Sequence, residues 1–379
     1  MKKKYYPAGI CAAAILATAI GLMLFWQHET ADLQTAAAEY HGESRSILLL
    51  KEYHSRAVIG AIGDILIHDW LYEDARTDGG FNFKPMFAHV KPLLSRPDFL
   101  LANQESLPGS PALEVSSYPV FCSPKEIIDA LQDAGVSMVT TANNHSYDKG
   151  EAGILRAISY YEQAGLPYTG SFKNKEDQQT IRYFSTGGIR FAVLSYTYGL
   201  NGFTLPKDKP YLVNLIDKEK MLHDIQQAKR KTDLIVLSIH WGTEYERKPN
   251  AMQKELAKEL VAEGADLIFG HHPHVLQPME MIRTSNGREG IVFYSLGNFL
   301  SGQLWDYKDV GGMAEVTVEK SVLGSHISVA IKDVQFHPTF TSSTRFRSYR
   351  VYPLEEARNK GLTSITNEQI NSFMSGAEH

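Results

Sequence analysis

The sequence has little cysteine: its 379 residues include only Cys11 and Cys122. Cys11 lies in an apolar run near the N-terminus, so the rest of the chain holds a single cysteine and cannot form an internal disulfide. This excludes a small secreted domain built on disulfides. We expect Cys122 to be a small buried hydrophobic residue.

Excess positive charge and nucleotide-binding motifs are also absent. The formal net charge is −5 and the pI about 6.3, so the chain lacks the basic surface of a nucleic-acid-binding protein. It contains neither G-x-x-x-x-G-K-[ST] nor a G-x-G-x-x-G after a predicted strand. Any ATP-driven step must therefore belong to a partner on the cytoplasmic side. No tandem repeat of fixed period is visible.

The N-terminus carries an apolar run from Ala8 to Trp26, preceded by three lysines. As a helix its 19 residues would span about 28 Å, nearly a bilayer core. The lysines favour a cytoplasmic N-terminus and an extracellular body. A cleaved signal with a site at residues 36–38 is the alternative, but the run is longer than a typical signal. We expect a single-pass cell-membrane anchor over 1–27 and a polar stalk over 28–54.

From about residue 55, short apolar runs alternate with helical patterns. We expect strands over 56–62, 98–102, 136–141, 233–239 and 265–269, and helices over 84–94, 123–135, 150–164, 217–231 and 250–263. Ser123 reads as a helix cap followed by Pro124, and Asp148 as the cap of the helix at Gly150. Alternating strands and helices predict βαβ units and a mainly parallel sheet.

Three other stretches have the character of antiparallel strands. Residues 180–198 and 276–299 each surround a glycine-containing turn, and residues 313–336 alternate as two more strands. These pieces predict a second sheet. A main domain over 55–340 would then be followed by a C-terminal extension over 341–379, in which 363–375 forms a short helix capped by Thr363 or Ser364.

Five predicted strands end in polar signatures, which are Gly63-Asp64, Asn103 with Glu105, Asn144-His145, His240, and His272 with His274. Parallel strands bring their C-terminal ends to one edge, where open α/β sheets bind ligands. The set offers two carboxylates, an amide and at least four imidazoles without thiolate, which suits Zn, Mn or Fe. Two metals roughly 3.5–4 Å apart could be held. Taken singly, each residue could equally be a turn or core residue.

Neighbouring polar residues have two readings each. His68, four residues after Asp64, could be a ligand or simply start a helix. Glu244 could contact substrate or only pack against the cleft. Asn298 is expected near the cleft, in a strand and turn beneath the site.

Six short motifs between about residues 57 and 300 together resemble the CapA family of bacterial capsule (poly-γ-glutamate) synthesis proteins. The motifs are Gly63-Asp64, Asn103-Gln104-Glu105, Asn143-Asn144-His145, His240-Trp241-Gly242-Thr243-Glu244-Tyr245, Gly270-His271-His272-Pro273-His274 and Tyr294-Ser295-Leu296-Gly297-Asn298-Phe299. Through that family the chain resembles the calcineurin-like metallophosphoesterases. The resemblance implies an α/β, metallophosphoesterase-like four-layer sandwich, in which helices flank two mixed sheets, with two divalent metals at the strand ends.

The resemblance also implies a role for each matching residue. The implied metal ligands are Asp64, Glu105, Asn144, His240, His272 and His274, with Glu105 as the bridging carboxylate. His145 would donate a proton or contact phosphate, and His271 could replace His272. The superfamily's first motif is Asp-x-His, whereas Ile65 and Leu66 follow Asp64. One metal would then lack a ligand or take it from His68.

Two functions follow from these patterns. One is an extracellular, membrane-anchored, metal-dependent hydrolase acting on a phosphoester or a cell-envelope polymer, which would need no serine or cysteine nucleophile. The other is a non-catalytic binding or export component that guides polyanionic poly-γ-glutamate beside other capsule synthase and export subunits. A third reading is an envelope-binding module whose site is vestigial.

Overall fold

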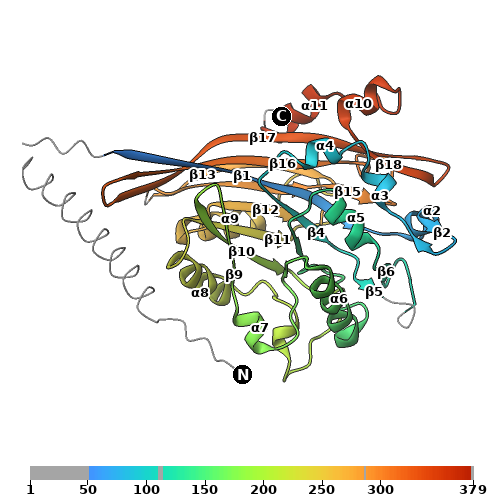
Figure 1. Cartoon of the computed structure of the whole chain (residues 1–379), viewed down its shortest axis with the longest axis horizontal. Coiled ribbons are helices and arrows are strands. Elements are labelled where there is room, and N and C mark those ends of the chain that lie inside the picture. The colour runs from blue at the N-terminus through green and yellow to red at the C-terminus, as the bar shows by residue number, and fades with distance from the viewer. Residues whose placement is uncertain (1–50, 110–113, 286, 377–379) are drawn as a thin grey trace, which may run out of the picture. The chain divides into compact units, whose positions relative to one another are not determined.

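Two mixed β-sheets form the frame of the computed structural model, which describes residues 51–109, 114–285 and 287–376 (Figure 1). The first sheet has the order β18-β17-β16-β1-β4-β7-β8, with β15 beside β1. Its strands are β1 (Glu52–Leu66), β4 (Phe99–Gln104), β7 (Met138–Thr140), β8 (Tyr168–Thr169), β15 (Asn298–Ser301), β16 (Val310–Leu323), β17 (His326–Thr344) and β18 (Arg347–Pro353). The strands β1, β4 and β7 run parallel, as the sequence predicts, and β8, which was not predicted, pairs parallel with β7.

The second sheet has the order β13-β14-β12-β11-β10-β9. Its strands are β9 (Arg182–Thr186), β10 (Ile189–Thr197), β11 (Leu234–His240), β12 (Leu267–His271), β13 (Leu276–Arg283) and β14 (Glu289–Leu296). The strands β10, β11, β12 and β14 are parallel. The edge strands β9 and β13 pair antiparallel with β10 and β14 and form the hairpins β9–β10 and β13–β14. The expected hairpins are therefore confirmed, but the third, β16–β17, joins the first sheet instead.

The helices are α2 (Asp69–Asp74), α3 (Lys84–Phe87), α4 (Lys91–Leu94), α5 (Ile127–Asp133), α6 (Gly150–Ala164), α7 (Lys175–Gln179), α8 (Lys218–Lys229), α9 (Ala251–Glu263), α10 (Leu354–Asn359) and α11 (Asn367–Met374). Helices α2 to α6 pack on the outer face of the first sheet, and α8 and α9 on that of the second. Among the residues described, no helix has the length and apolar character to cross a membrane. The predicted anchor and nearly all of the predicted stalk lie outside the described residues.

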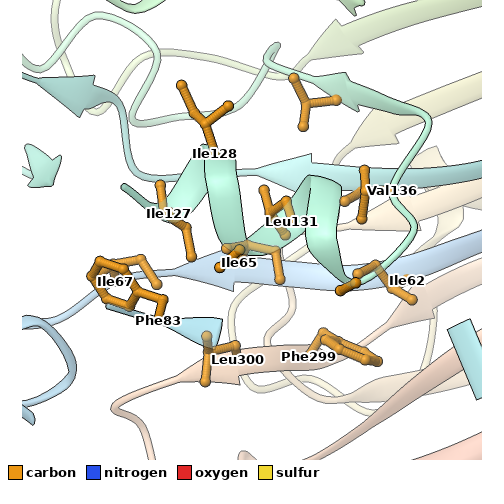
Figure 2. Close-up of a cluster of buried hydrophobic side chains, with 14 of the residues drawn as sticks. Ile62, Ile65, Ile67, Phe83, Ile127, Ile128, Leu131, Val136, Phe299 and Leu300 are labelled. Carbon is orange, nitrogen blue, oxygen red and sulfur yellow. The ribbon is translucent and has the colours of Figure 1, made fainter. Parts of the chain in front are cut away.

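Three hydrophobic cores separate four layers. One fills the space between the two sheets, with Ile59 of β1 and Phe269 of β12 among its members. A second lies between the second sheet and the helices α8 and α9. The third packs α5 against the first sheet: Figure 2 shows Leu131 above Ile65 of β1. Each strand contributes side chains to the cores on both sides of its sheet, because successive side chains point to opposite faces. The mixed α/β architecture expected from the sequence is confirmed.

Several local predictions are wrong. Ser123 and Pro124 do not start a helix but form β6 (Ser123–Pro124), which pairs with β5 (Pro108–Gly109), and α5 begins at Ile127. The helix expected over 84–94 is two short helices, because Pro92 lacks the N–H that would continue the first. The C-terminal helix is capped by Thr366, which accepts a hydrogen bond from the Gln369 backbone N–H.

The C-terminal residues continue the main sheet. Strand β17 crosses position 340, and β18 pairs with it over residues 347–353. Helices α10 and α11 then pack on β17 and close one side of the core between the sheets. A small ladder, β2 (Arg76–Thr77) with β3 (Gly80–Phe81), lies before α3.

Candidate metal centre

The first site carboxylate, Asp64, lies on a bulge inside β1 rather than after its end. The register of β1 against β4 shifts between Ile62 and Asp64, and a bulge re-aims the side chain that it carries. Gly63 makes the bulge possible, since a Cβ there would lie 2.0 Å from the Gly297 carbonyl oxygen. The Asp64 N–H donates to that same oxygen at 2.9 Å.

The Asp64 side chain is fully buried and held by several donors. Asn103 Nδ2 donates to Asp64 Oδ1 at 2.8 Å, and His271 Nδ1 lies 3.0 Å from the same atom. His274 Nδ1 lies 3.3 Å from Oδ2. Burial would raise the pKa of Asp64, but the hydrogen bonds from His271 and His274 outweigh it and hold that pKa well below its usual range. Asp64 is therefore a charged, fixed carboxylate.

Glu105, which follows β4 directly, is also fully buried but lacks such donors. Neither carboxylate oxygen accepts a hydrogen bond from any described residue. Its nearest basic neighbours are His240 Nε2 at 3.5 Å and His274 Nε2 at 3.6 Å from Oε1. Burial raises the pKa of Glu105 well above its usual range. Burying a carboxylate without hydrogen bonds destabilises the folded protein. The position of Glu105 therefore indicates a role other than stabilising the fold.

The histidine loop after β12 holds two residues in an unusual backbone conformation. His272 has φ 97° and His274 has φ 58°, which is rare for residues other than glycine and typical of strain at functional sites. The His272 N–H donates to Asp64 Oδ2 at 3.3 Å, and His274 Nδ1 lies 3.0 Å from Asn298 Oδ1. With Nδ1 donating to Asn298, the His274 Nε2 atom is left facing Glu105.

Three groups of side chains bring a ligand atom from each member within 4.8 Å of the others. The first is Asp64, Glu105 and His274; the second is Glu105, His240 and His272; the third is Glu244, His272 and His274. The first two share Glu105. Asn144 extends the second, because its Oδ1 lies 2.8 Å from His240 Nε2. The six residues expected as ligands are thus brought together at the C-terminal ends of strands from both sheets.

The histidines of the centre differ in charge. Burial, and then repulsion from His274, lowers the pKa of His272 to about 3. Burial, followed by His272, lowers the pKa of His240 well below its usual value. Burial also disfavours charged His274, but attraction to Glu105 and Asp64 prevails and raises its pKa to about 9. At neutral pH, His240 and His272 therefore carry the free lone pairs that metals bind.

His145, the expected proton donor, is held by Asp148. His145 Nδ1 lies 2.8 Å from Asp148 Oδ2, which also accepts the Phe121 N–H at 2.6 Å. The His145 ring meets the edge of Phe121, with ring centroids 4.7 Å apart. Asp148 was expected to cap α6; it does not, since Lys149 is the N-cap residue and provides no side-chain cap. Instead Asp148 orients His145.

The four additional candidates, His68, His271, Asn298 and Glu244, take different positions. His68 is the buried N-cap residue of α2; its Nδ1 lies 3.1 Å from both the Leu66 carbonyl oxygen and the Gly302 nitrogen. Burial lowers its pKa to about 4, and it belongs to none of the three groups found among the described residues. His271 holds Asp64, Asn298 holds His274, and Glu244 is an exposed residue at the edge of the third group.

Two residues near the centre, Tyr198 and Asn201, were not predicted as site residues. Asn103 was predicted at the strand end without a role, and it holds Asp64 by a hydrogen bond. Tyr198, directly after β10, packs its ring on His272 with centroids 4.5 Å apart. The exposed Asn201 accepts a hydrogen bond from Asn144 Nδ2 at 3.1 Å, and its own Nδ2 lies 3.3 Å from His145 Nδ1. Tyr198 obeys the strand-end rule, but the hairpin pattern of 180–198 concealed that β10 is also a parallel strand.

The donor atoms fit divalent metals. Both Glu105 oxygens and His272 Nδ1 are buried without a hydrogen-bond partner among the described residues, which is uncommon for polar atoms in native proteins. They lie among carboxylate, amide and imidazole donors, the nitrogen and oxygen set that suits Zn, Mn or Fe. Unpaired donor atoms grouped in this way could hold a metal ion.

Comparison with known proteins agrees with the motifs. The family model "Bacterial capsule synthesis protein PGA_cap" matches residues 58–303, which span the whole centre. The chain is similar to "Capsule biosynthesis protein CapA" of Bacillus anthracis, with 35% identity over 229 residues, 58% of this chain and 54% of that protein. It is also similar to "PGA biosynthesis protein CapA" of Bacillus subtilis (strain 168), with 29% identity over 271 residues, 69% and 68% of the two chains.

The chain thus spans about half the length of the B. anthracis relative. Among solved structures, it is similar to the 5'-nucleotidase precursor from Thermus thermophilus, with a TM-score of 0.43 and 14% identity over 74% of this chain and 54% of that one. With the matched region running from β1 through β15, this chain belongs to the family of bacterial capsule synthesis proteins.

Proposed function

We propose that this protein is a metal-dependent hydrolase of the phosphoester class that acts in capsule polymer biosynthesis. The observation that carries the proposal is Glu105: a buried carboxylate without hydrogen bonds, shared by two groups of potential ligands. A carboxylate in that position suits a bridge between two cations. Its environment differs from that of Asp64, whose oxygens are satisfied by protein donors.

Two sets of residues would hold the metals. Asp64, Glu105 and His274 would form one, and Glu105, Asn144, His240 and His272 the other. Bound divalent metals would supply Lewis acidity, acidifying a water and stabilising charge on phosphoryl oxygens. The protein preorganises these ligands, since Asn103 and His271 fix Asp64 and Asn298 fixes His274.

The proton for a leaving oxygen would come from His145. Asp148 accepts the Nδ1 hydrogen of His145 at 2.8 Å and fixes the orientation of the ring, which leaves Nε2 as the nitrogen that can donate. Asn201 and Tyr198 line the same side, next to His145 and His272. In this proposal, they would contact the group that flanks the scissile bond.

The setting of this activity is part of the proposal. The Ala8–Trp26 run supports a single-pass anchor, with three lysines inside and the domain outside the cell. The substrate would then be a phosphoester or polymer of the cell envelope, handled beside other capsule synthase and export subunits. The names of the relatives, which refer to capsule and PGA biosynthesis, support that context.

The test is hydrolysis of bis(p-nitrophenyl) phosphate by the purified full chain supplied with Mn²⁺ or Zn²⁺. We expect metal-dependent turnover that a His272→Ala, His274→Ala double variant abolishes. His145→Gln should keep the metals but lose roughly 10²–10⁴-fold in turnover. Lys254→Gln, an exposed change on α9, should match the wild type. Equal release of product by all four proteins would refute the assignment.

One observation favours a second function, a non-catalytic component that binds or guides the polymer. Leu66, 1% exposed, occupies the position of the histidine in the Asp-x-His motif, and His68 is outside the three ligand groups of the described residues. The set around Asp64 consequently offers three side-chain donors. Metal binding without any turnover, with normal capsule polymer in cells carrying the His145→Gln variant and loss of polymer in cells carrying the His272→Ala, His274→Ala variant, would select this function.

A further inference from the structure

A cavity of about 800 Å³ lies beside the metal centre, on the side of the C-terminal strands. It is lined by residues 304–307 and 309, by 340–343, 345 and 346 around the end of β17, and by 361–365 after α10. Its volume is in the range of ligand-binding sites. All its lining residues lie beyond the family-matched region 58–303, so membership of the family does not account for it.

Exposed aromatic rings are gathered at this cavity. Trp305 is 65% exposed and Phe346 is 37% exposed, and both line it. Their ring centroids are 6.0 Å apart, edge to face. Trp70, 43% exposed at the start of α2, packs on Phe346 at 4.6 Å. Large apolar rings left together in solvent are unfavourable unless they serve an interaction.

The backbone holds these rings outward at a cost. Trp305, Asp306 and Tyr307 have consecutive positive φ values of 64°, 49° and 62°, and Arg345 and Phe346 have 51° and 60°. Arg345 and Phe346 form the two-residue turn of the hairpin β17–β18, where positive φ values are common. The three consecutive positive φ values at 305–307 have no such explanation, and each is strained relative to an ordinary turn. Positive φ values also occur in the histidine loop of the metal centre, at His272 and His274. Strain of this kind tends to concentrate at functional sites.

The polar lining indicates the chemistry of the ligand. Its charged side chains are two carboxylates, Asp306 and Asp309, and one guanidinium, Arg345. Lys308 is alongside but pairs with Asp306 at 3.4 Å. There is no excess of positive charge to attract a polyanion. The lining also has five aliphatic hydroxyl groups, from Thr341, Ser342, Ser343, Thr363 and Ser364. Hydroxyl groups beside exposed aromatic faces suit an uncharged, polyhydroxylated ligand.

The cavity is joined to the metal centre by the loop at 302–309. Asn298, which holds His274, donates to the Lys308 carbonyl oxygen at 2.9 Å and to Gln303 Oε1 at 3.1 Å. Lys308 Nζ lies 5.2 Å from the Tyr245 ring centroid, on the loop that follows β11. A ligand seated on Trp305 would therefore lie on the loop that supports the centre.

We propose that this cavity binds a glycan chain, with sugar rings stacked on Trp305 and Phe346. The axial C–H bonds of a pyranose make an apolar face that packs flat on an aromatic ring, while its hydroxyl groups exchange hydrogen bonds with serine and threonine. A polyanionic polymer is disfavoured by the balanced charge, and the concave lining favours a chain over a flat protein surface. The inference concerns binding and does not depend on the proposed hydrolysis.

The test uses the purified full chain and a panel of immobilised glycans: oligomers of N-acetylglucosamine, glucose and mannose, and purified cell-wall glycan strands, with poly-γ-glutamate as the charged comparison. We expect one glycan class to bind, with a change in tryptophan fluorescence. Of the four tryptophans, Trp26 lies outside the described residues, Trp241 is buried, and Trp70 and Trp305 are exposed, so a fluorescence change that Trp305→Ala abolishes would report the aromatic cluster. Binding should persist in EDTA, because the cavity contains none of the proposed metal ligands.

Variants make the result decisive. Trp305→Ala should weaken glycan binding roughly tenfold or more, and Trp305→Phe should restore part of it. Tyr183→Ala, which removes an exposed ring from β9 in the other sheet, should change nothing. Because Trp305 is mostly exposed, circular dichroism should show a folded variant. No binding to any glycan, equal binding by Trp305→Ala, or preference for poly-γ-glutamate would overturn the proposal.

Discussion

Replacing Glu105 by glutamine should stabilise the metal-free protein and weaken the metal-loaded one. In the absence of metal, the Glu105 carboxylate is buried with no hydrogen-bond donor among the described residues. Leaving a buried polar or charged group unsatisfied costs about 1–3 kcal/mol. Glutamine keeps the shape but cannot take on the negative charge that burial disfavours at this position. We expect a gain of about 1–3 kcal/mol in the free energy of unfolding in EDTA.

With metal bound, the wild type should be more stable than the Glu105→Gln variant. A ligand at about 100 times its dissociation constant stabilises the folded state by about 2.7 kcal/mol, and only the wild type would gain that in full. Urea unfolding, with and without Mn²⁺, measures both effects. With a slope of about 3 kcal/mol per M, the EDTA midpoints should differ by roughly 0.3–1 M.

The matched control is Glu255→Gln on α9, where the side chain is exposed. It should change the free energy of unfolding by no more than about 0.5 kcal/mol in either condition. If Glu105→Gln is less stable than wild type in EDTA, Glu105 makes a favourable interaction in the metal-free fold. The reasoning that assigns it to a cation would then fail.

Three further substitutions test the fold and the proton donor. Gly63→Ala should prevent soluble expression or cost several kcal/mol, since its Cβ would lie 2.0 Å from a backbone oxygen, whereas Gly199→Ala, with open space around it, should leave the melting temperature unchanged. Leu131→Ala should cost about 2–5 kcal/mol in urea unfolding, because Leu131 is fully buried under β1; a loss below 1 kcal/mol would contradict this packing. Asp148→Asn should lower phosphoester turnover on the order of 10²-fold with metal content unchanged, and equal turnover would remove Asp148 from the proton-donor assignment.

The position of the site at the strand ends could be predicted, because the C-terminal ends of parallel strands lie at the same edge of a sheet. Apolar runs set the parallel strands, and the polar residue after each run falls at the same edge. Helix ends are also visible in the sequence where the residues that fix them are close together. Gly165, in the left-handed conformation, ends α6, and Asn250 caps α9 together with Gln253. Such interactions involve residues a few positions apart and are visible in the sequence.

Predictions failed where distant residues decide the structure. Ser123 has the sequence of a helix cap, but its hydroxyl group lies 3.3 Å from the Ser106 and Leu107 carbonyl oxygens, and its backbone pairs in β6. Asp148 is placed correctly for a cap, yet it turns to His145 and the Phe121 N–H. No spacing along the chain reveals either choice, because the competing partners arrive only when the sheet is assembled.

The bulge at Asp64 illustrates the same limit. The sequence places Gly63-Asp64 at the end of a strand, whereas β1 continues to Leu66. Only the approach of Gly297, which directly precedes β15, explains why a glycine precedes the carboxylate. The aromatic cavity could not be foreseen either, since Trp70, Trp305 and Phe346 lie far apart in the chain and meet only through folding.

The most direct test of the dinuclear centre is the metal content of the purified full chain by inductively coupled plasma mass spectrometry, after dialysis against Mn²⁺ or Zn²⁺ and then buffer. The account predicts about two ions per wild-type chain, and fewer in a folded Glu105→Ala variant because both groups lose their shared carboxylate. A wild type without metal, or a Glu105→Ala variant that retains both ions, would contradict it.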